Sequence, residues 1–215
     1  MNSPFRKVSK AAVGDAHAIY LGVYDWLKTK GVRQWLRASP EDAFAEFQRK
    51  GQLFAYYIDD RMAAVVIVAF EATPYWAEVL GGESRWWIRS LAVDRVWHGA
   101  GIGPRVLAAC ESFIQEAGAT QAYLDCVGAG FLPGYYAGLG YETLARKEIT
   151  YPSGNTFAMA LMTKRLANQE AAPTRAHLTL RANSRAEPRE DGTPCAGPTA
   201  DSGAGGDTSG LCGSP

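Results

Sequence analysis

The chain of 215 residues is long enough for one or two domains, and its 47% of hydrophobic residues can supply a substantial core. Its 22 basic and 22 acidic residues give a net charge of zero, so nothing in the charge predicts binding to nucleic acid or to an acidic membrane surface. No apolar run is long enough for a membrane span or a signal peptide. We therefore expect a cytoplasmic protein that acts on a small molecule or a peptide.

The four cysteines are consistent with a reducing compartment. Cys110 and Cys126 fall in a predicted helix and a predicted strand, while Cys195 and Cys212 lie near the C-terminus. They form no CxxC pair and have no metal-ligand spacing. We expect reduced thiols and no metal site.

The first part of the chain predicts a short strand within 5–11 and two helices. Asp15 is expected to cap the first helix, and Gly31 to end it. Ser39 is expected to cap the second helix, with Pro40 in its first turn. The loop between the helices, GVRQWLR, contains Trp35, which either anchors the loop or borders a site.

A hairpin and a central strand follow. Residues 52–60 and 62–70 are rich in aromatic and β-branched residues and meet at a turn of two aspartates, so we expect two antiparallel strands. The segment 71–84 contains Pro74 and two adjacent glycines, and we expect a loop. Residues 85–93, RWWIRSLAV, predict the central strand.

The segment 91–118 predicts an anion-binding turn between this strand and a helix. Apolar residues at three- and four-residue steps predict one buried helix face: Ile102, Val106, Leu107, Cys110, Phe113, Ile114 and Ala117. Gly118 should end the helix. Before it, Gly99, Ala100, Gly101 and Gly103 have almost no side chain, so backbone N–H groups can approach a ligand, and Pro104 suits the first helical position. Free amides and the helix dipole favour a phosphate or pyrophosphate.

Three other interpretations compete for this turn. It could be a tight connection that binds nothing, because a single glycine cluster is weak support for a ligand site. A nucleotide-triphosphate loop is disfavoured because no Lys-Ser or Lys-Thr follows the glycines. A dinucleotide-binding fold is also disfavoured, because the preceding strand is central in the domain rather than first.

The remaining segments complete a mixed α/β pattern. We expect a strand at 121–127, a short helix at 132–138 and a final hairpin of 141–151 with 156–164, turned at 152–155. From residue 167 onwards small, polar and proline residues dominate, so we expect a disordered tail over 167–215 after a domain of residues 1–166.

The run LAVDRVWHGAGIGPRVL resembles the acetyl-CoA signature of the GNAT superfamily of N-acyltransferases. In that signature a strand precedes Arg/Gln-x-x-Gly-x-Gly/Ala at a helix start, and His98, Gly101 and Gly103 hold those positions here. Downstream, LDCVGAGFLPGYYAGLGYE resembles the second signature of the family, with Tyr136 followed by Gly140 and Tyr141. The resemblance covers roughly residues 5 to 166. It implies a central, mostly antiparallel sheet with splayed parallel central strands and flanking helices.

The resemblance also implies a chemistry and a set of site residues. Acetyl-CoA would be the co-substrate, bound by the strand end (Leu91, Ala92, Val93) and by the turn (His98, Gly99, Ala100, Gly101, Ile102, Gly103, Pro104). A backbone N–H of the strand would bind the thioester carbonyl oxygen. Tyr136 matches the tyrosine that protonates the departing thiolate, although the adjacent Tyr135 is the alternative.

The acceptor side is less specified by the sequence. The candidates for a general base are Glu71, Glu78, Glu83 and Asp125, each of which could equally be a solvated surface charge. Trp35 is a candidate substrate contact, and Arg89 could bind an acceptor carboxylate or pair with a neighbouring acid. Trp35, Trp76, Trp86 and Trp87 together predict a partly aromatic cleft.

We therefore expect an N-acetyltransferase that transfers an acetyl group from acetyl-CoA to a primary amine of a small metabolite or peptide, as a monomer or homodimer. The alternative is a non-catalytic module that binds or senses acyl-CoA. His98 replaces the usual Arg or Gln and the asparagine common in the second signature is missing, and both departures favour this alternative.

Overall fold

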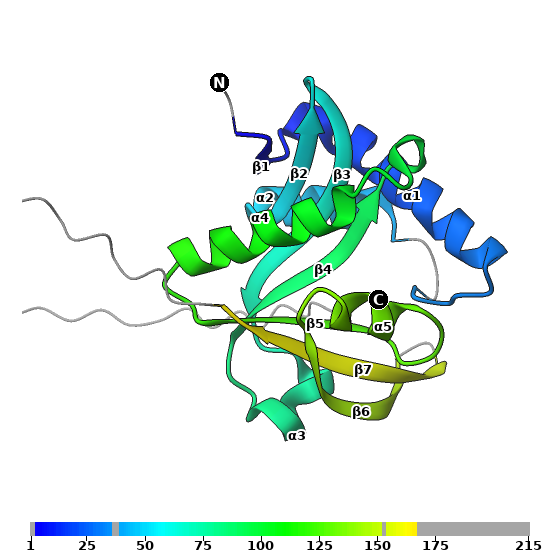
Figure 1. The fold of residues 1–215 in the computed structure, drawn as a ribbon, viewed down its shortest axis with the longest axis vertical. Coiled ribbons are helices and arrows are strands. Elements are labelled where there is room, and N and C mark those ends of the chain that lie inside the picture. The colour runs from blue at the N-terminus through cyan, green and yellow to red at the C-terminus, as the bar shows by residue number, and fades with distance from the viewer. Residues whose placement is uncertain (1–2, 36–38, 152–153, 167–215) are drawn as a thin grey trace, which may run out of the picture. The chain divides into compact units, whose positions relative to one another are not determined.

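The computed structural model describes residues 3–35, 39–151 and 154–166, which form one sheet with helices on both faces (Figure 1). The sheet has seven strands in the order β1-β2-β3-β4-β5-β7-β6. The strands are β1 (Phe5–Lys7), β2 (Leu53–Ile58), β3 (Arg61–Glu71), β4 (Arg85–Val93), β5 (Gln121–Val127), β6 (Glu142–Thr150) and β7 (Thr156–Arg165). The helices are α1 (Val13–Thr29), α2 (Glu41–Arg49), α3 (Ala77–Leu80), α4 (Ile102–Glu116) and α5 (Leu132–Ala137).

The strand pairing confirms the expected mixed α/β sheet. Every neighbouring pair of strands is antiparallel except β4 and β5, which run parallel. The register of β4 and β5 contains one partner pair, Trp87 with Tyr123. Beyond that pair the two strands diverge, as Figure 1 shows. The gap between the C-terminal ends of β4 and β5 positions the site described below.

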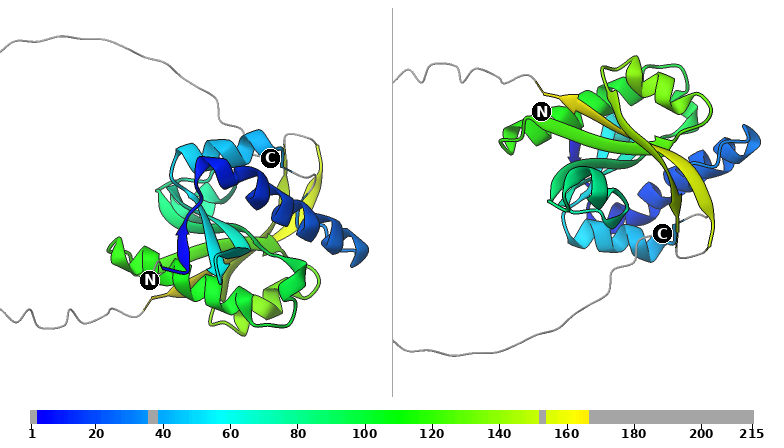
Figure 2. Two further views of the ribbon diagram at one scale, coloured as in Figure 1. Left: turned by 90° about the horizontal axis from the view of Figure 1, so that it is seen from above. Right: turned by 90° about the horizontal axis from the view of Figure 1, so that it is seen from below.

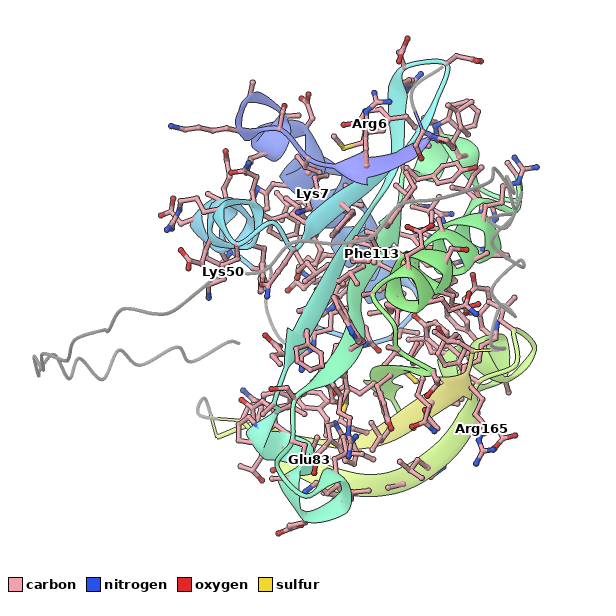
Figure 3. All side chains as sticks on the ribbon, turned by 90° about the vertical axis from the view of Figure 1, so that its left-hand side faces the viewer. Arg6, Lys7, Lys50, Glu83, Phe113 and Arg165 are labelled. Atoms are coloured by element: carbon pink, nitrogen blue, oxygen red, sulfur yellow. The ribbon has the colours of Figure 1, made fainter. Side chains whose placement is uncertain are left out.

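Two large apolar clusters hold the helices against opposite faces of the sheet (Figure 2). On one face α4 buries Ile102, Val106, Leu107, Cys110 and Ile114 against β3, β4 and β5. Phe113 of α4 also points toward the strands (Figure 3). On the other face α1 and α2 pack on β2 and β3. A third cluster surrounds Trp76 and Trp87 near α3.

Several elements match the sequence prediction closely. The central strand occupies 85–93 as expected, and the helix after the glycine turn begins at Ile102. Gly118 follows that helix with a φ of 84°, a left-handed conformation that favours glycine. Asp59 and Asp60 form the two-residue hairpin turn with φ values of 47° and 60°, as aspartates tolerate.

Both predicted side-chain caps were wrong. α1 begins at Val13 with Ala12 at the N-cap, so Asp15 lies within the first turn. α2 has Pro40 at its N-cap, without a capping side chain. The Ser39 side chain is engaged elsewhere, because its Oγ accepts a hydrogen bond from the Tyr20 hydroxyl at 3.5 Å.

The segment 71–84 was predicted as a loop, but much of it is ordered by packing. Glu71 is the last residue of β3, and residues 74–76 form a 3₁₀ turn that leads into α3. The buried Trp76 anchors this turn, and Gly81 ends α3 in a left-handed conformation with a φ of 74°. Two details of α4 also differ from the prediction. Pro104 is the third residue of the helix rather than the first, and Ala117 lies just beyond its end and is exposed instead of buried.

Two further expectations bear on the whole chain. Cys110 and Cys126 are free and buried, as predicted for reduced thiols. None of the helices within the described ranges is long and apolar enough to cross a membrane. The predicted tail, with Cys195 and Cys212, and the centre of the 152–155 turn lie outside the described residues.

Candidate acyl-transfer site

The end of β4 is irregular where it leaves β5. Pairing with β3 shifts between Val65 and Ile67, and Ser90 opposite this step has a φ of 49°. A non-glycine residue in the left-handed region is strained, and such bulges redirect the backbone groups that follow. Leu91, Ala92 and Val93 therefore follow a kink, after which Ala92 and Val93 pair again with Val65 and Ala64 of β3. This is the segment predicted to contact the thioester.

The glycine turn leads directly from this strand end into α4. Gly99 and Gly101 have φ values of 78° and 69°, and a Cβ on either residue would meet nothing within 4 Å. The space in front of the turn is therefore open. Gly101 is the N-cap of α4, so the amides of Ile102 and Gly103 belong to the first helical turn, which has no intrahelical acceptor. These residues suit a diphosphate.

Ala100 and His98 of the turn were both predicted to contact the cofactor, and the structure engages each of them in another contact. The N–H of Ala100 donates to the carbonyl of Trp97 at 3.1 Å, so it closes the turn and is not available to a ligand in this conformation. His98 is exposed, and its ring centroid lies 6.5 Å from that of Trp26 on α1. The guanidinium of Arg95 lies over the same indole at 4.0 Å. Trp26 thus supports the turn from α1, a role that the sequence did not predict.

The helix α5 brings the predicted tyrosine next to the glycine turn. Tyr136 is half-buried between the rings of Tyr135 and Tyr141, with centroid separations of 5.2 and 6.1 Å. Burial raises the pKa of Tyr136 above its ordinary value, and the neighbouring Cys126 raises it further. Its hydroxyl therefore remains a proton donor at neutral pH. Tyr135 packs against Gly103 of α4.

Of the four candidate bases, two are exposed and engaged in surface ion pairs. The carboxylate of Glu78 is 85% exposed and lies 3.2 Å from the ammonium of Lys147. That of Glu83 is 70% exposed and lies 2.8 Å from the guanidinium of Arg85. Figure 3 shows Glu83 beside α3, at the outer edge of the molecule. Neither residue is well placed to accept a proton in the gap between β4 and β5.

Of the other two candidates, Asp125 lies on β5 two residues beyond Tyr123, and Glu71 ends β3 opposite Arg85, at the start of β4. Asp125 on β5 accepts a hydrogen bond from the indole N–H of Trp76 at 2.9 Å. Glu71 forms an ion pair with Arg89, whose guanidinium also lies 4.9 Å from the ring centroid of Trp87. Arg89 is thus held by an internal acid, the alternative left open by the sequence, and this contact competes with its proposed role toward an acceptor carboxylate.

Tyr151 joins the same group of side chains, although the sequence did not single it out. Its pKa is raised to about 12, chiefly by burial and to a smaller extent by Asp125 and Tyr75, while Arg89 opposes the shift. Its ring lies 5.2 Å from Tyr75 and 6.2 Å from Phe157. Asp125 therefore lies in an aromatic environment, but the four tryptophans do not form the cleft predicted from the sequence. Trp76 and Trp87 are fully buried in the cluster near α3, Trp86 packs on Phe113 of α4, and Trp35 packs on Tyr20.

Gln34 is a further site residue that sequence reasoning missed. Its side-chain oxygen accepts a hydrogen bond from the N–H of Val127 at 2.8 Å. The N–H of Gly128, the residue after β5, donates to the carbonyl of Ala158 on β7. Because successive residues direct their backbone groups to opposite edges of a strand, the Val127 N–H points toward β4. The only signal in the sequence was the position of Gln34 in the polar and aromatic loop beside Trp35.

Trp35 itself packs on the opposite face of the sheet from α4. Its ring centroid lies 4.6 Å from that of Tyr20, which anchors the loop to α1. It also lines a cavity next to α1. The structure therefore supports Trp35 as an anchor of the loop, and its place beside the acceptor stays a prediction. Clusters of three or more potential metal ligands do not occur within the described parts of the chain.

Comparisons with known proteins agree with this arrangement. A model of the acetyltransferase (GNAT) family matches residues 20–131. The uncharacterized N-acetyltransferase YesJ of Bacillus subtilis (strain 168) is 32% identical over 126 residues, which cover 55% of this chain and 69% of YesJ.

Solved structures share the fold at lower identity. A GNAT family acetyltransferase from Listeria monocytogenes has a TM-score of 0.63 and 16% identity, covering 75% of this chain and 94% of its own. The yncA protein of Salmonella typhimurium, whose structure includes its cofactor acetyl-CoA, has a TM-score of 0.57 and 15% identity, covering 81% and 99%. By its sequence and by its fold, the chain belongs to the acetyltransferase (GNAT) family.

Proposed function

We propose that this acetyltransferase transfers the acetyl group of acetyl-CoA to a primary amine of a small metabolite or peptide. The observation that carries the proposal is the gap between β4 and β5, which starts after a single residue pair and ends beside the first turn of α4. Such a gap admits an extended thioester arm between two strand edges. The open space in front of Gly99 and Gly101 fits a diphosphate.

Each step has a candidate group in this site. Acetyl-CoA supplies an activated acyl group as a thioester. A backbone N–H of residues 91–93, redirected by the bulge at Ser90, donates to the carbonyl oxygen of the thioester and stabilises developing negative charge there. Asp125, directly or through a water molecule, takes a proton from the acceptor ammonium so that the amine can attack. The Tyr136 hydroxyl then donates a proton to the leaving sulfur.

Two measurements test the proposal. Calorimetric titration with acetyl-CoA should give saturable binding, and release of free thiol in the presence of a panel of primary amines should report turnover. Saturable binding without turnover of any amine would favour the alternative, a module that binds or senses acyl-CoA. Absence of binding at millimolar acetyl-CoA would overturn both.

We also propose a cytoplasmic location. Its support is that Cys110 and Cys126, the two cysteines within the described ranges, are buried as free thiols. Fractionation of cells that express a tagged version of the protein would test this location directly.

A further inference from the structure

A cavity of about 260 Å³ lies between the end of α1, the loop after it and the start of β7. Its apolar wall includes Tyr24, Val32, Trp35 and Phe157. Its size suits one substituted aromatic ring, since an apolar cavity of roughly 150 Å³ holds benzene. The cavity therefore offers an aromatic lining to a flat, largely apolar group.

The charged side chains that line this cavity are both cations. Lys28 extends along α1 with its ammonium 5.3 Å from the ring centroid of Tyr24, and Arg33 is exposed at the start of the loop. Carboxylates do not occur among the described lining residues. A guanidinium and an ammonium beside an aromatic wall favour an oxyanion on an apolar body.

The loop residue Gln34 links the cavity to the proposed acyl-transfer site. Gln34 lies between Arg33 and Trp35 and bonds to Val127 at the edge of β5 that faces β4. On the other side of the cavity, Phe157 contacts Tyr151, which lies near Asp125. Contacts of the loop and of β7 thus join the lining of the cavity to residues beside Asp125.

We infer that this cavity binds the anionic end of the acceptor, so that the preferred substrate is a primary amine whose carboxylate is separated from the amino group by an aromatic or other apolar body. This inference rests on the proposed function. It assigns the acceptor carboxylate to Lys28 and Arg33 instead of Arg89, because Arg89 is paired with Glu71. The amino group then faces Asp125, and the two ends of the substrate meet opposite charges.

A matched pair of probes tests the charge requirement. 4-(Aminomethyl)benzoate and benzylamine share an aromatic ring and an aminomethyl group and differ in the carboxylate. We expect kcat/KM, measured by thiol release at saturating acetyl-CoA, to be at least tenfold higher for 4-(aminomethyl)benzoate. Arg33→Gln and Lys28→Gln should each reduce this preference several-fold, mainly through KM. Lys30→Gln removes a nearby charge that does not line the cavity and should leave the preference unchanged.

The outcomes separate this inference from the proposed function. Equal or better use of benzylamine by the wild-type chain, or an equal effect of Lys30→Gln, would overturn the inference and leave acetyl transfer intact. If neither probe is acetylated, the cavity assignment is tested by the binding of 4-methylbenzoate, measured by saturation-transfer NMR. Binding to the wild type that Arg33→Gln abolishes and Lys30→Gln preserves would support the cavity assignment, and absence of binding would overturn it.

Discussion

The hydroxyl group of Tyr135 on α5 lies against the α-carbon of Gly103 on α4, where a Cβ atom on that residue would stand. Gly103 thus makes room for a side chain of the protein. The sequence had predicted that this glycine makes room for a ligand. Through this contact α5 covers part of the first turn of α4. The position of α5, and with it of Tyr136, depends on the absence of a side chain at residue 103.

The first prediction follows from this contact. Gly103→Ala should lower the free energy of unfolding by up to about 1 kcal/mol, because the added methyl group overlaps the Tyr135 hydroxyl while the higher helix propensity of alanine offsets part of the cost. The next ring atom, Cζ, would lie 3.6 Å from the new Cβ, an ordinary contact. Tyr135→Phe should therefore restore most of the lost stability in the double variant. Urea unfolding of the four proteins measures the coupling, and purely additive effects would contradict the prediction.

A second prediction concerns the proposed proton donor. Tyr136→Phe should lower kcat by roughly tenfold or more and leave the affinity for acetyl-CoA nearly unchanged, because the hydroxyl acts on the leaving sulfur. The raised pKa of Tyr136 keeps the group protonated beyond about pH 10, so its ionisation should not limit kcat below that pH. Tyr57→Phe, on β2, is the matched control. Equal kinetics of the Tyr136→Phe variant and the wild type would exclude this role.

The third prediction distinguishes the candidate bases. Asp125→Asn should reduce kcat/KM by roughly a hundredfold, because the isosteric amide can still accept a hydrogen bond from Trp76 but cannot take a proton. Glu83→Gln removes an exposed carboxylate of the same charge and should have little effect. Steady-state kinetics over a range of pH values would measure both. A normal rate for Asp125→Asn would exclude Asp125 as the general base and leave Glu71 as the candidate.

A fourth prediction concerns stability at alkaline pH. Burial raises the pKa of the Cys126 thiol from 9.0 to about 12 and that of Tyr151 from 10.0 to about 12. The unfolded chain loses these protons first, so the free energy of unfolding should be constant below about pH 8 and fall as the pH rises from 9 toward 12. For Cys126 the loss at pH 10.5 is about 2 kcal/mol.

Urea unfolding at several pH values checks this dependence. Cys126→Ala should lower stability at pH 7, because a buried side chain is truncated, and should also make the decline between pH 9 and 11 shallower. The quantity to compare is therefore the slope of the free energy of unfolding against pH, not its value at one pH. A wild-type slope that this variant leaves unchanged would show that Cys126 does not contribute.

The last prediction concerns residues 167–215. Truncation after Leu166 should change Tm and acetyl-CoA affinity little, because the composition of that segment cannot bury enough apolar area to offset the entropy of ordering. Leu166 itself must stay, since it is buried and its N–H donates to the Thr120 carbonyl at 2.8 Å. Differential scanning calorimetry of the two lengths would test this, and a fall of several degrees would indicate docking.

The features predicted correctly from the sequence are those encoded by contiguous residues. The strand over 85–93, the glycine turn and α4 each follow from local apolar patterning and from backbone conformations that glycine permits. The caps were predicted wrongly because capping competes with tertiary contacts. Ser39 had the right residue type, but its Oγ accepts a hydrogen bond from the Tyr20 hydroxyl, 19 positions away in the chain.

The parts of the site that could not be predicted depend on strand register and on distant contacts. Gln34 and Val127 are 93 positions apart, and no spacing pattern links them. The ion pair of Arg89 with Glu71 depends on how β3 aligns with β4. The bulge at Ser90 interrupts the regular pairing, and the alternation of apolar and polar residues along β4 does not reveal it. A sequence pattern can indicate that a residue is charged, but the pairing of strands decides which opposite charge it meets.

The single pair of Trp87 with Tyr123 also divides the sheet into two hydrogen-bonded parts. Strands β1 to β4 pair in chain order, and β5, β6 and β7 pair among themselves, so each part forms from residues close in the sequence. In native-state hydrogen exchange, the amides along the facing edges of β4 and β5 should exchange well before those between β2 and β3. A ligand that fills the gap would supply the missing acceptors, and the slowing of exchange at those edges would measure how firmly it joins the two parts.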